Sequence, residues 1–146
     1  MPNGSASGPS PRGPLLALRT VLRDAPGCIR CAVVYYGGMS IMNPRYFSFS
    51  PDEEPLVRDF SPVYHLAQQD PANVPPLFVA KAGLDRPFLN ESIDEFVAFA
   101  SARTIPITFM NHPAGEHGFD ILNDDARSRE IIKASLAFVH EHLDRL

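Results

Sequence analysis

Two polar segments follow apolar runs in the second half of the chain. Asp85 comes directly after the run Pro76–Ala82, and His117 lies in the glycine-containing segment Asn111–Asp120, which follows the run Ile105–Met110. Chemistry in open α/β sheets lies beyond the carboxyl ends of the strands. An acid and a histidine there form the later part of a Ser…Asp…His series, in which the histidine is a general base oriented by the carboxylate.

Each residue also has a structural interpretation. His117 has glycines two positions before it and one after it, at Gly115 and Gly118, which favours a base held in a tight loop over an ordinary surface-loop histidine. Asp85 precedes Arg86-Pro87, so it could instead stabilise a turn or cap a helix. Asp120 and Asp124 are expected to serve turns or helix caps.

Other constellations of reactive residues are weak. Cys28 and Cys31 form a single C-x-x-C, which has no second pair and is interpreted as two reduced structural cysteines. His112 and His117 are spaced poorly for a metal site, and Gly37-Gly38 lacks the pattern of a phosphate-binding loop. We therefore expect no metal and no cofactor.

Length and composition indicate one ordinary globular domain. The chain has 146 residues, 45% hydrophobic and 21% charged, with a formal net charge of −4. A basic stripe is absent, which argues against nucleic-acid binding. Apolar runs are shorter than the roughly 18 residues of a membrane span, and the Pro/Ser/Gly-rich start lacks the apolar core of a secretory signal. A cytoplasmic location without membrane association is the expectation.

Apolar periodicity predicts helices alternating with strands. The order is a short helix, a strand, a long connection, a strand, a helix, a strand and a final helix, which implies a mostly parallel sheet of about three strands flanked by helices. Asn90 and Asp124 are the predicted helix caps. The predicted ranges are 15–22 for the first helix, 31–36, 77–82 and 105–110 for the strands, and 39–75 for the connection, with a helical turn near 63–69.

Three strands make a narrow α/β sheet. The first strand has the continuous apolar character of a sheet interior, but nothing upstream supplies strands to cover its other side. We therefore expect that the N-terminal strands of the domain are absent. An uncovered strand edge pairs readily with another chain, which makes a homodimer through this edge an open possibility.

At residue level the chain resembles the C-terminal half of an α/β-hydrolase, and the dienelactone hydrolase-like group in particular. The matching residues are Ala82-Gly83-Leu84-Asp85 for the acid loop, Gly115-Glu116-His117-Gly118-Phe119 for the histidine loop, and Tyr36-Gly37-Gly38 for the turn after the strand that follows the nucleophile helix. The resemblance covers about nine tenths of the chain. It implies a partial α/β-hydrolase domain over residues 14–146, in which 37–76 form a long cap-like connection.

The resemblance also implies a nucleophile on a tight turn before the first helix, which falls on Ser10. This turn, within the irregular tail 1–13, departs from the family pattern G-x-S-x-G. Pro11 follows the serine and has no backbone N–H to donate to an oxyanion, and Arg12 stands near the position of a small residue. Ser10 could equally be one more serine of a Ser/Pro/Gly tail.

Two functions compete. The first is hydrolysis of a small carboxylic ester or lactone, in which Ser10 attacks, His117 moves the proton and Asp85 orients the histidine. The second is a truncated or catalytically inactive hydrolase remnant that acts, if at all, as an interaction module. Apolar and aromatic residues also cluster after the first predicted strand. They could line an acyl or ring pocket or simply cover the sheet: Tyr35, Tyr36, Met39, Met42, Tyr46, Phe47 and Phe49.

Overall fold

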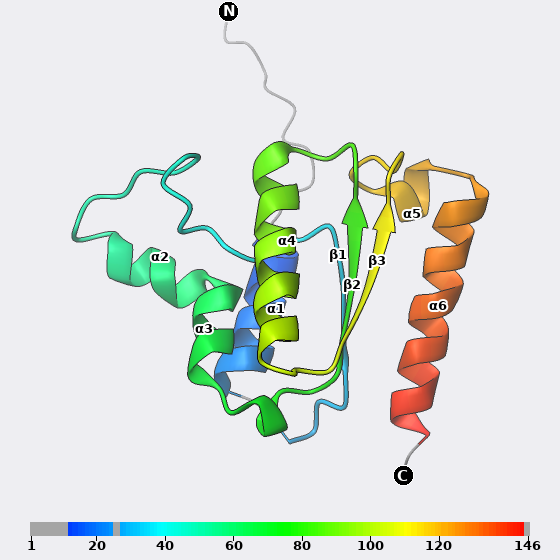
Figure 1. Cartoon of the computed structure of the whole chain (residues 1–146), viewed down its shortest axis with the longest axis horizontal. Helices are drawn as coiled ribbons and strands as arrows, with labels where there is room; N and C mark the ends of the chain where they lie inside the picture. The colour runs from blue at the N-terminus through cyan, green and yellow to red at the C-terminus, as the bar shows by residue number, and fades with distance from the viewer. Residues whose placement is uncertain (1–11, 25–26, 145–146) are drawn as a thin grey trace, which may run out of the picture.

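The structure is a computed structural model that describes residues 12–24 and 27–144. Helices and strands alternate along most of the chain (Figure 1). The elements are α1 (Arg12–Asp24), β1 (Ala32–Tyr35), α2 (Glu54–Phe60), α3 (Pro62–Gln68), the 3₁₀ turn η1 (Pro71–Asn73), β2 (Leu77–Ala82), α4 (Pro87–Ala102), β3 (Ile107–His112), α5 (Phe119–Leu122) and α6 (Ala126–Leu143).

The three described strands form one parallel sheet in the order β1-β2-β3. Val34 of β1 pairs with Val79 of β2, which pairs with Phe109 of β3. All three carboxyl ends therefore lie at the same edge of the sheet, at the top of Figure 1. The predicted partial α/β fold with a small parallel sheet flanked by helices is confirmed.

Successive residues of β2 face two separate cores. Leu77 and Val79 pack with α1 and α4 on one side, whereas Phe78 and Ala80 pack with α5 and α6 on the other. Figure 1 shows these two helical layers on opposite faces of the sheet. Burial on both faces explains the continuous apolar sequence of β2.

The connection between β1 and β2 is more helical than the sequence predicts. The predicted turn near 63–69 is α3, and α2 precedes it without having been predicted. Proline occupies the first turn of each helix, at Pro55 and Pro62, where its missing N–H costs no hydrogen bond. Arg103 holds α3 in place by donating from its guanidinium to the carbonyls of Leu66 and Gln69.

Several predicted boundaries move by one to three residues: α1 spans 12–24 instead of 15–22, and β1 spans 32–35 instead of 31–36. β3 begins at Ile107 rather than Ile105, because Thr104 has a positive φ of 57° and Ile105 N–H still bonds to Ala100 at the end of α4. The N-cap of α6 is Asp125 rather than Asp124, since the Asp125 side chain accepts from Ser128 N–H. These local contacts of single residues do not follow from periodicity.

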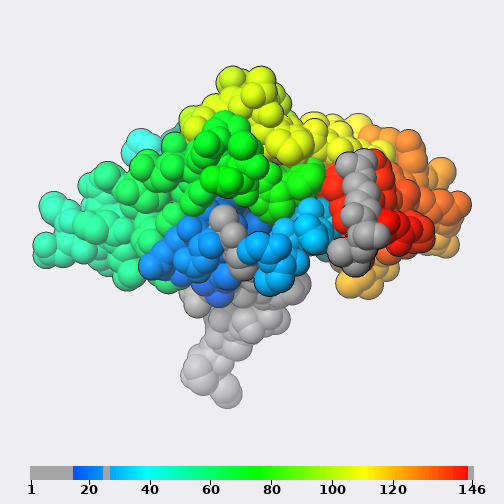
Figure 2. All heavy atoms as spheres, turned by 90° about the horizontal axis from the view of Figure 1, so that it is seen from below, coloured from blue at the N-terminus to red at the C-terminus, as the bar shows by residue number. Residues whose placement is uncertain are grey.

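Figure 2 views the molecule from the end at which the strands begin, so the edge that carries the carboxyl ends lies on the hidden side. Blue α1 and the green segments occupy the centre of this face, and red α6 lies to one side. Among the residues that the structure describes, no helix is both long and apolar enough to cross a membrane.

Candidate functional site

The acid loop after β2 and the histidine loop after β3 are joined by their backbones. Gly83 N–H donates to His112 C=O at 2.8 Å, and Leu84 N–H donates to Gly115 C=O at 2.9 Å. At Gly83 the two loops touch so closely that an added Cβ would lie 2.3 Å from the carbonyl oxygen of Pro113. Only glycine fits there without moving backbone, so this residue sets the spacing of the two loops.

Within this frame, Asp85 and His117 meet. His117 Nδ1 lies 2.6 Å from Asp85 Oδ2, and the side chains are 30% and 3% exposed respectively. The other Asp85 oxygen accepts the backbone N–H of Arg86 at 2.7 Å. No described residue hydrogen-bonds Nε2 of His117. The histidine is therefore oriented through one nitrogen by a buried carboxylate, and the second nitrogen is left for another group.

Asn90 supports the acid loop instead of capping a helix. α4 begins earlier than predicted, at Pro87, which places Asn90 within its first turns. Its side-chain amide donates to the carbonyls of Gly83, at 3.1 Å, and Asp85, at 3.4 Å. This contact fixes the backbone on both sides of Leu84.

Tyr36, the residue that follows β1, also contacts the histidine loop. Its ring centroid lies 4.5 Å from that of His117, and its hydroxyl donates to Asp120 Oδ1 at 2.5 Å. Burial, and then the hydrogen bond to the Asp120 carboxylate, raise the pKa of Tyr36 well above its usual value. Its φ of 38° is uncommon for a residue other than glycine and recurs at functional sites.

The role of Asp120 was predicted wrongly as a turn or cap residue. Gly118, with a φ of 89°, turns the chain into the short helix α5 and carries Asp120 under the Tyr36 hydroxyl. The sequence signal was the tyrosine of Tyr36-Gly37-Gly38. Its partner, 84 residues away, could not be inferred from spacing.

A second histidine–aspartate pair lies nearby but differs in exposure. His112 Nε2 contacts Asp125 Oδ2 at 3.0 Å and Ser128 Oγ at 3.0 Å, and the His112 side chain is only 4% exposed. The backbone N–H of Ser128, foremost, lowers the pKa of Asp125. With Nε2 occupied and the ring buried, His112 joins β3 to the start of α6 and has no nitrogen available to an outside ligand.

Ser10 lies outside the described residues. The helix that would follow a nucleophile turn, α1, begins at Arg12, and Leu15 in its first turns approaches the chain just past Tyr36, where a Cβ on Gly38 would lie 3.6 Å from Leu15 Cδ1. The start of α1 and the Asp85–His117 pair are thus linked through the segment Tyr36–Gly38.

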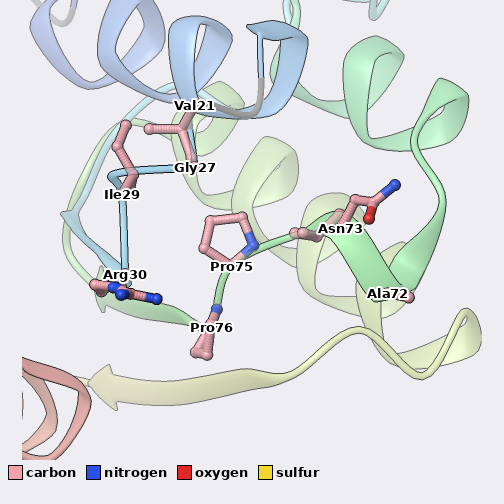
Figure 3. Close-up of a pocket in the computed structure, with 9 residues that line it drawn as sticks. Val21, Gly27, Ile29, Arg30, Ala72, Asn73, Pro75 and Pro76 are labelled. Carbon is pink, nitrogen blue, oxygen red and sulfur yellow. The ribbon is translucent and has the colours of Figure 1, made fainter. Parts of the chain in front are cut away.

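Other possible sites in the described part of the chain carry less chemistry. No group of three or more His, Cys, Asp or Glu side chains there is placed to hold a metal ion. A hollow of about 250 Å³ is lined by Val21, by Gly27, Ile29 and Arg30 before β1, and by Ala72 to Pro76 before β2 (Figure 3). It lies where the strands begin, at the opposite end of the sheet from Asp85 and His117.

Comparison with known proteins bears on the fold. No protein-family model matches the sequence. A search of curated proteins finds no relative.

Solved structures do match. An esterase from Thermogutta terrifontis with bound propionate aligns with a TM-score of 0.60 and 16% identity over 77% of this chain and 42% of the esterase. S-formylglutathione hydrolase from Staphylococcus aureus aligns with a TM-score of 0.54 and 20% identity over 83% of this chain and 47% of the hydrolase. The fluorophosphonate-binding serine hydrolase F of the same organism aligns with a TM-score of 0.58 and 19% identity over 83% of this chain and 50% of that protein.

At these identities the comparison establishes the fold. The chain spans about half the length of these solved structures or less. The matched proteins are esterases and serine hydrolases, and the described elements correspond to part of their chains. The chain therefore has the fold of part of an α/β-hydrolase.

Proposed function

We propose that this chain hydrolyses small carboxylic esters or lactones through a triad of Ser10, Asp85 and His117, with Ser10 as nucleophile. One observation carries the proposal: a nearly buried Asp85 holds Nδ1 of a partly exposed His117 at 2.6 Å, beyond the carboxyl ends of parallel strands. The esterases and serine hydrolases that share the fold support it. The resemblance to the dienelactone hydrolase-like group supports esters and lactones as the substrate class.

The second ring nitrogen of His117, Nε2, does the chemistry in this proposal. Nε2 accepts the proton of the serine hydroxyl as Oγ bonds to the ester carbonyl carbon, and then returns it to the departing alkoxide. Water repeats the sequence: Nε2 takes its proton, hydroxide adds to the acyl-enzyme and serine leaves with that proton. Asp85 stabilises the imidazolium that forms.

The nucleophile turn makes this site weaker than a standard one. Pro11 cannot supply the oxyanion N–H that usually follows the nucleophile, and loss of one such donor typically slows turnover by about 10²–10³-fold. We therefore expect slow hydrolysis of activated esters by this chain.

Labelling with a fluorophosphonate, followed by mass spectrometry of the folded chain, tests the proposal directly. One of the proteins of this fold is described as fluorophosphonate-binding, which makes this class of probe suitable. An adduct on Ser10 that is lost in Ser10→Ala and His117→Ala, and kept in Ser7→Ala, supports the triad. A folded chain that takes no label, or takes it on another residue, overturns the assignment of Ser10.

The second candidate is a catalytically inactive remnant that acts as an interaction module. Pro11 and Arg12 in the nucleophile turn favour it, and β1 forms one outer edge of the described sheet. In a parallel ladder alternate residues direct their N–H and C=O to each side, so Val33 and Tyr35 offer theirs on the side away from β2. Light scattering across protein concentrations separates a homodimer through this edge from a monomer.

A further inference from the structure

A mostly apolar cavity of about 620 Å³ lies between the start of α1, α2 and the start of α4. Its walls include Leu15 and Leu16 of α1, Phe60 of α2, and Phe88 and Leu89 of α4, and all of its described lining residues are apolar or glycine. Pockets for small ligands commonly have this size and character. Among the lining residues that the structure describes, no acid, base or amide would anchor a polar ligand.

The outer wall of this cavity is held in place. Phe47, in the segment after β1, packs edge-to-face against Phe88 with centroids 5.6 Å apart, and its neighbour Tyr46 donates from its hydroxyl to Glu91 at 2.6 Å. These contacts tie the segment to α4. The cavity is therefore built between anchored walls.

The cavity is linked to the candidate site along the chain by Gly38. Gly38 lines it, and a Cβ there would lie 3.6 Å from Leu15 and 3.7 Å from Leu89. Gly38 comes two residues after Tyr36, whose ring contacts His117, and Leu89 comes four residues after Asp85. Leu15, which also lines the cavity, lies near the start of α1, the helix that follows the proposed nucleophile Ser10 in the sequence.

From this placement we infer that the cavity binds the hydrocarbon part of the acyl group, so that the preferred substrates are esters of medium-chain or aromatic carboxylic acids. The inference rests on the proposed function for its link to catalysis. The binding of an apolar chain beside Gly38 can be tested without catalysis. A chain of about six to ten carbons suits a partly open cavity of this size.

The test uses acetate, butyrate, hexanoate and octanoate as probes, because each is the product of a candidate ester and binds without a nucleophile. Two-dimensional NMR of the whole chain follows the amides of Gly38 and Ile41, with Gly27 at the far end of the sheet as the reference. We expect affinity to rise about two- to fourfold per added methylene, as burial of apolar surface predicts. Equal affinity along the series, or shifts centred elsewhere, would overturn the inference.

Graded filling of the cavity supplies the variants. Gly38 has no positive φ and a Cβ there meets ordinary contact distances, so Gly38→Ala should keep most of the chain-length effect and Gly38→Val should abolish it. Phe47→Ala opens the outer wall and should weaken the binding of octanoate more than that of acetate. This variant replaces Gly38→Val if Gly38→Val does not fold. Ile121→Ala, exposed on α5, is the matched control.

Failure of this inference is separable from failure of the proposed function. Chain-length-dependent binding without a fluorophosphonate adduct on Ser10 keeps the cavity and removes the hydrolase. An adduct on Ser10 without chain-length dependence does the reverse. Gly38 and Ile41 signals that shift with protein concentration instead of with probe would mean that a second copy covers the cavity, which also overturns the inference.

Discussion

The hydroxyl of Tyr36 donates a 2.5 Å hydrogen bond to Asp120, three residues beyond His117. The same side chain lies with its ring against the imidazole, at 4.5 Å between centroids. The segment after β1 thus holds the histidine loop through Tyr36. The orientation of His117 depends on a strand that contributes no residue to the proposed triad.

Tyr36→Phe should lower kcat/KM for an activated short-chain ester by roughly tenfold, since a hydrogen bond to a charged partner is worth about 1.5–3 kcal/mol. The ring contact remains, so the protein should stay folded. Tyr35→Phe is the matched control, because that hydroxyl bonds to Ser135 on α6, away from His117. Equal activity in the wild type and Tyr36→Phe would show that the contact does not position the histidine.

Asp85→Asn should reduce kcat/KM by about 10³–10⁴-fold, because an amide does not stabilise the imidazolium and permits the wrong tautomer. Nitrogen-15 chemical shifts of the His117 ring should show a proton on Nδ1 in the wild type and a changed tautomer in the variant. Glu116→Gln removes an exposed carboxylate next to His117 and should leave both readouts unchanged. An unaltered ring spectrum in Asp85→Asn would contradict the orienting role.

Gly83→Ala should destabilise the fold, because its Cβ would meet the backbone of Pro113 and force the two loops apart. Overpacking of this kind typically costs about 1–3 kcal/mol. Gly27→Ala, where an added Cβ meets nothing within 4 Å, should be close to neutral. Urea unfolding of the two variants gives the comparison, and equal midpoints would mean that the loops separate freely.

Asp125→Ala should lower the urea midpoint by about 0.5 M through loss of the α6 cap and of the His112 contact, whereas Asp124→Ala should have a smaller effect. The pKa of Asp125 is lowered on folding, so its contribution is present above pH 3.8 and is lost as pH falls through the folded value. The gap between wild type and Asp125→Ala should therefore close in acid. A gap that is constant from neutral pH into acid would argue against an ionised cap.

Alkaline pH should destabilise the wild type through Tyr36. Its pKa is raised on folding, so above the ordinary value of 10.0 the unfolded chain loses this proton while the folded chain keeps it. The associated stability is present below pH 10 and declines as pH rises. Urea midpoints should fall less steeply above pH 10 in Tyr36→Phe than in the wild type, and parallel curves would show that Tyr36 does not govern this range.

The sequence predicts the strands and main helices well where burial has a period. Continuous apolar runs mark β2 because both of its faces are covered. In α6 the apolar repeat predicts the helix but not its buried face, which carries Ser128, Ile131 and Ser135. Leu136 and Leu143 of the predicted apolar face are exposed. Asp85 and His117 were found because each follows such a run. Their catalytic role stays a prediction.

Contacts between segments that are distant in the sequence could not be predicted from it. Nothing in the spacing joins Tyr36 to Asp120, or assigns Asn90 to the acid loop instead of a helix cap. α2 was missed because its proline at the first turn resembles a loop signal and none of its residues is buried. Such features depend on tertiary packing, which local patterns do not encode.

The close approach of Gly83 to Pro113 has a consequence for protein engineering. The acid and histidine loops are joined by backbone hydrogen bonds, and between Gly83 and Pro113 there is no room for a Cβ. The two loops therefore form one structural unit, and neither can change length independently of the other. A chimera with its crossover between the two loops would combine halves that were never fitted to each other. Recombination with another hydrolase should therefore exchange β2 through α5 as a single block.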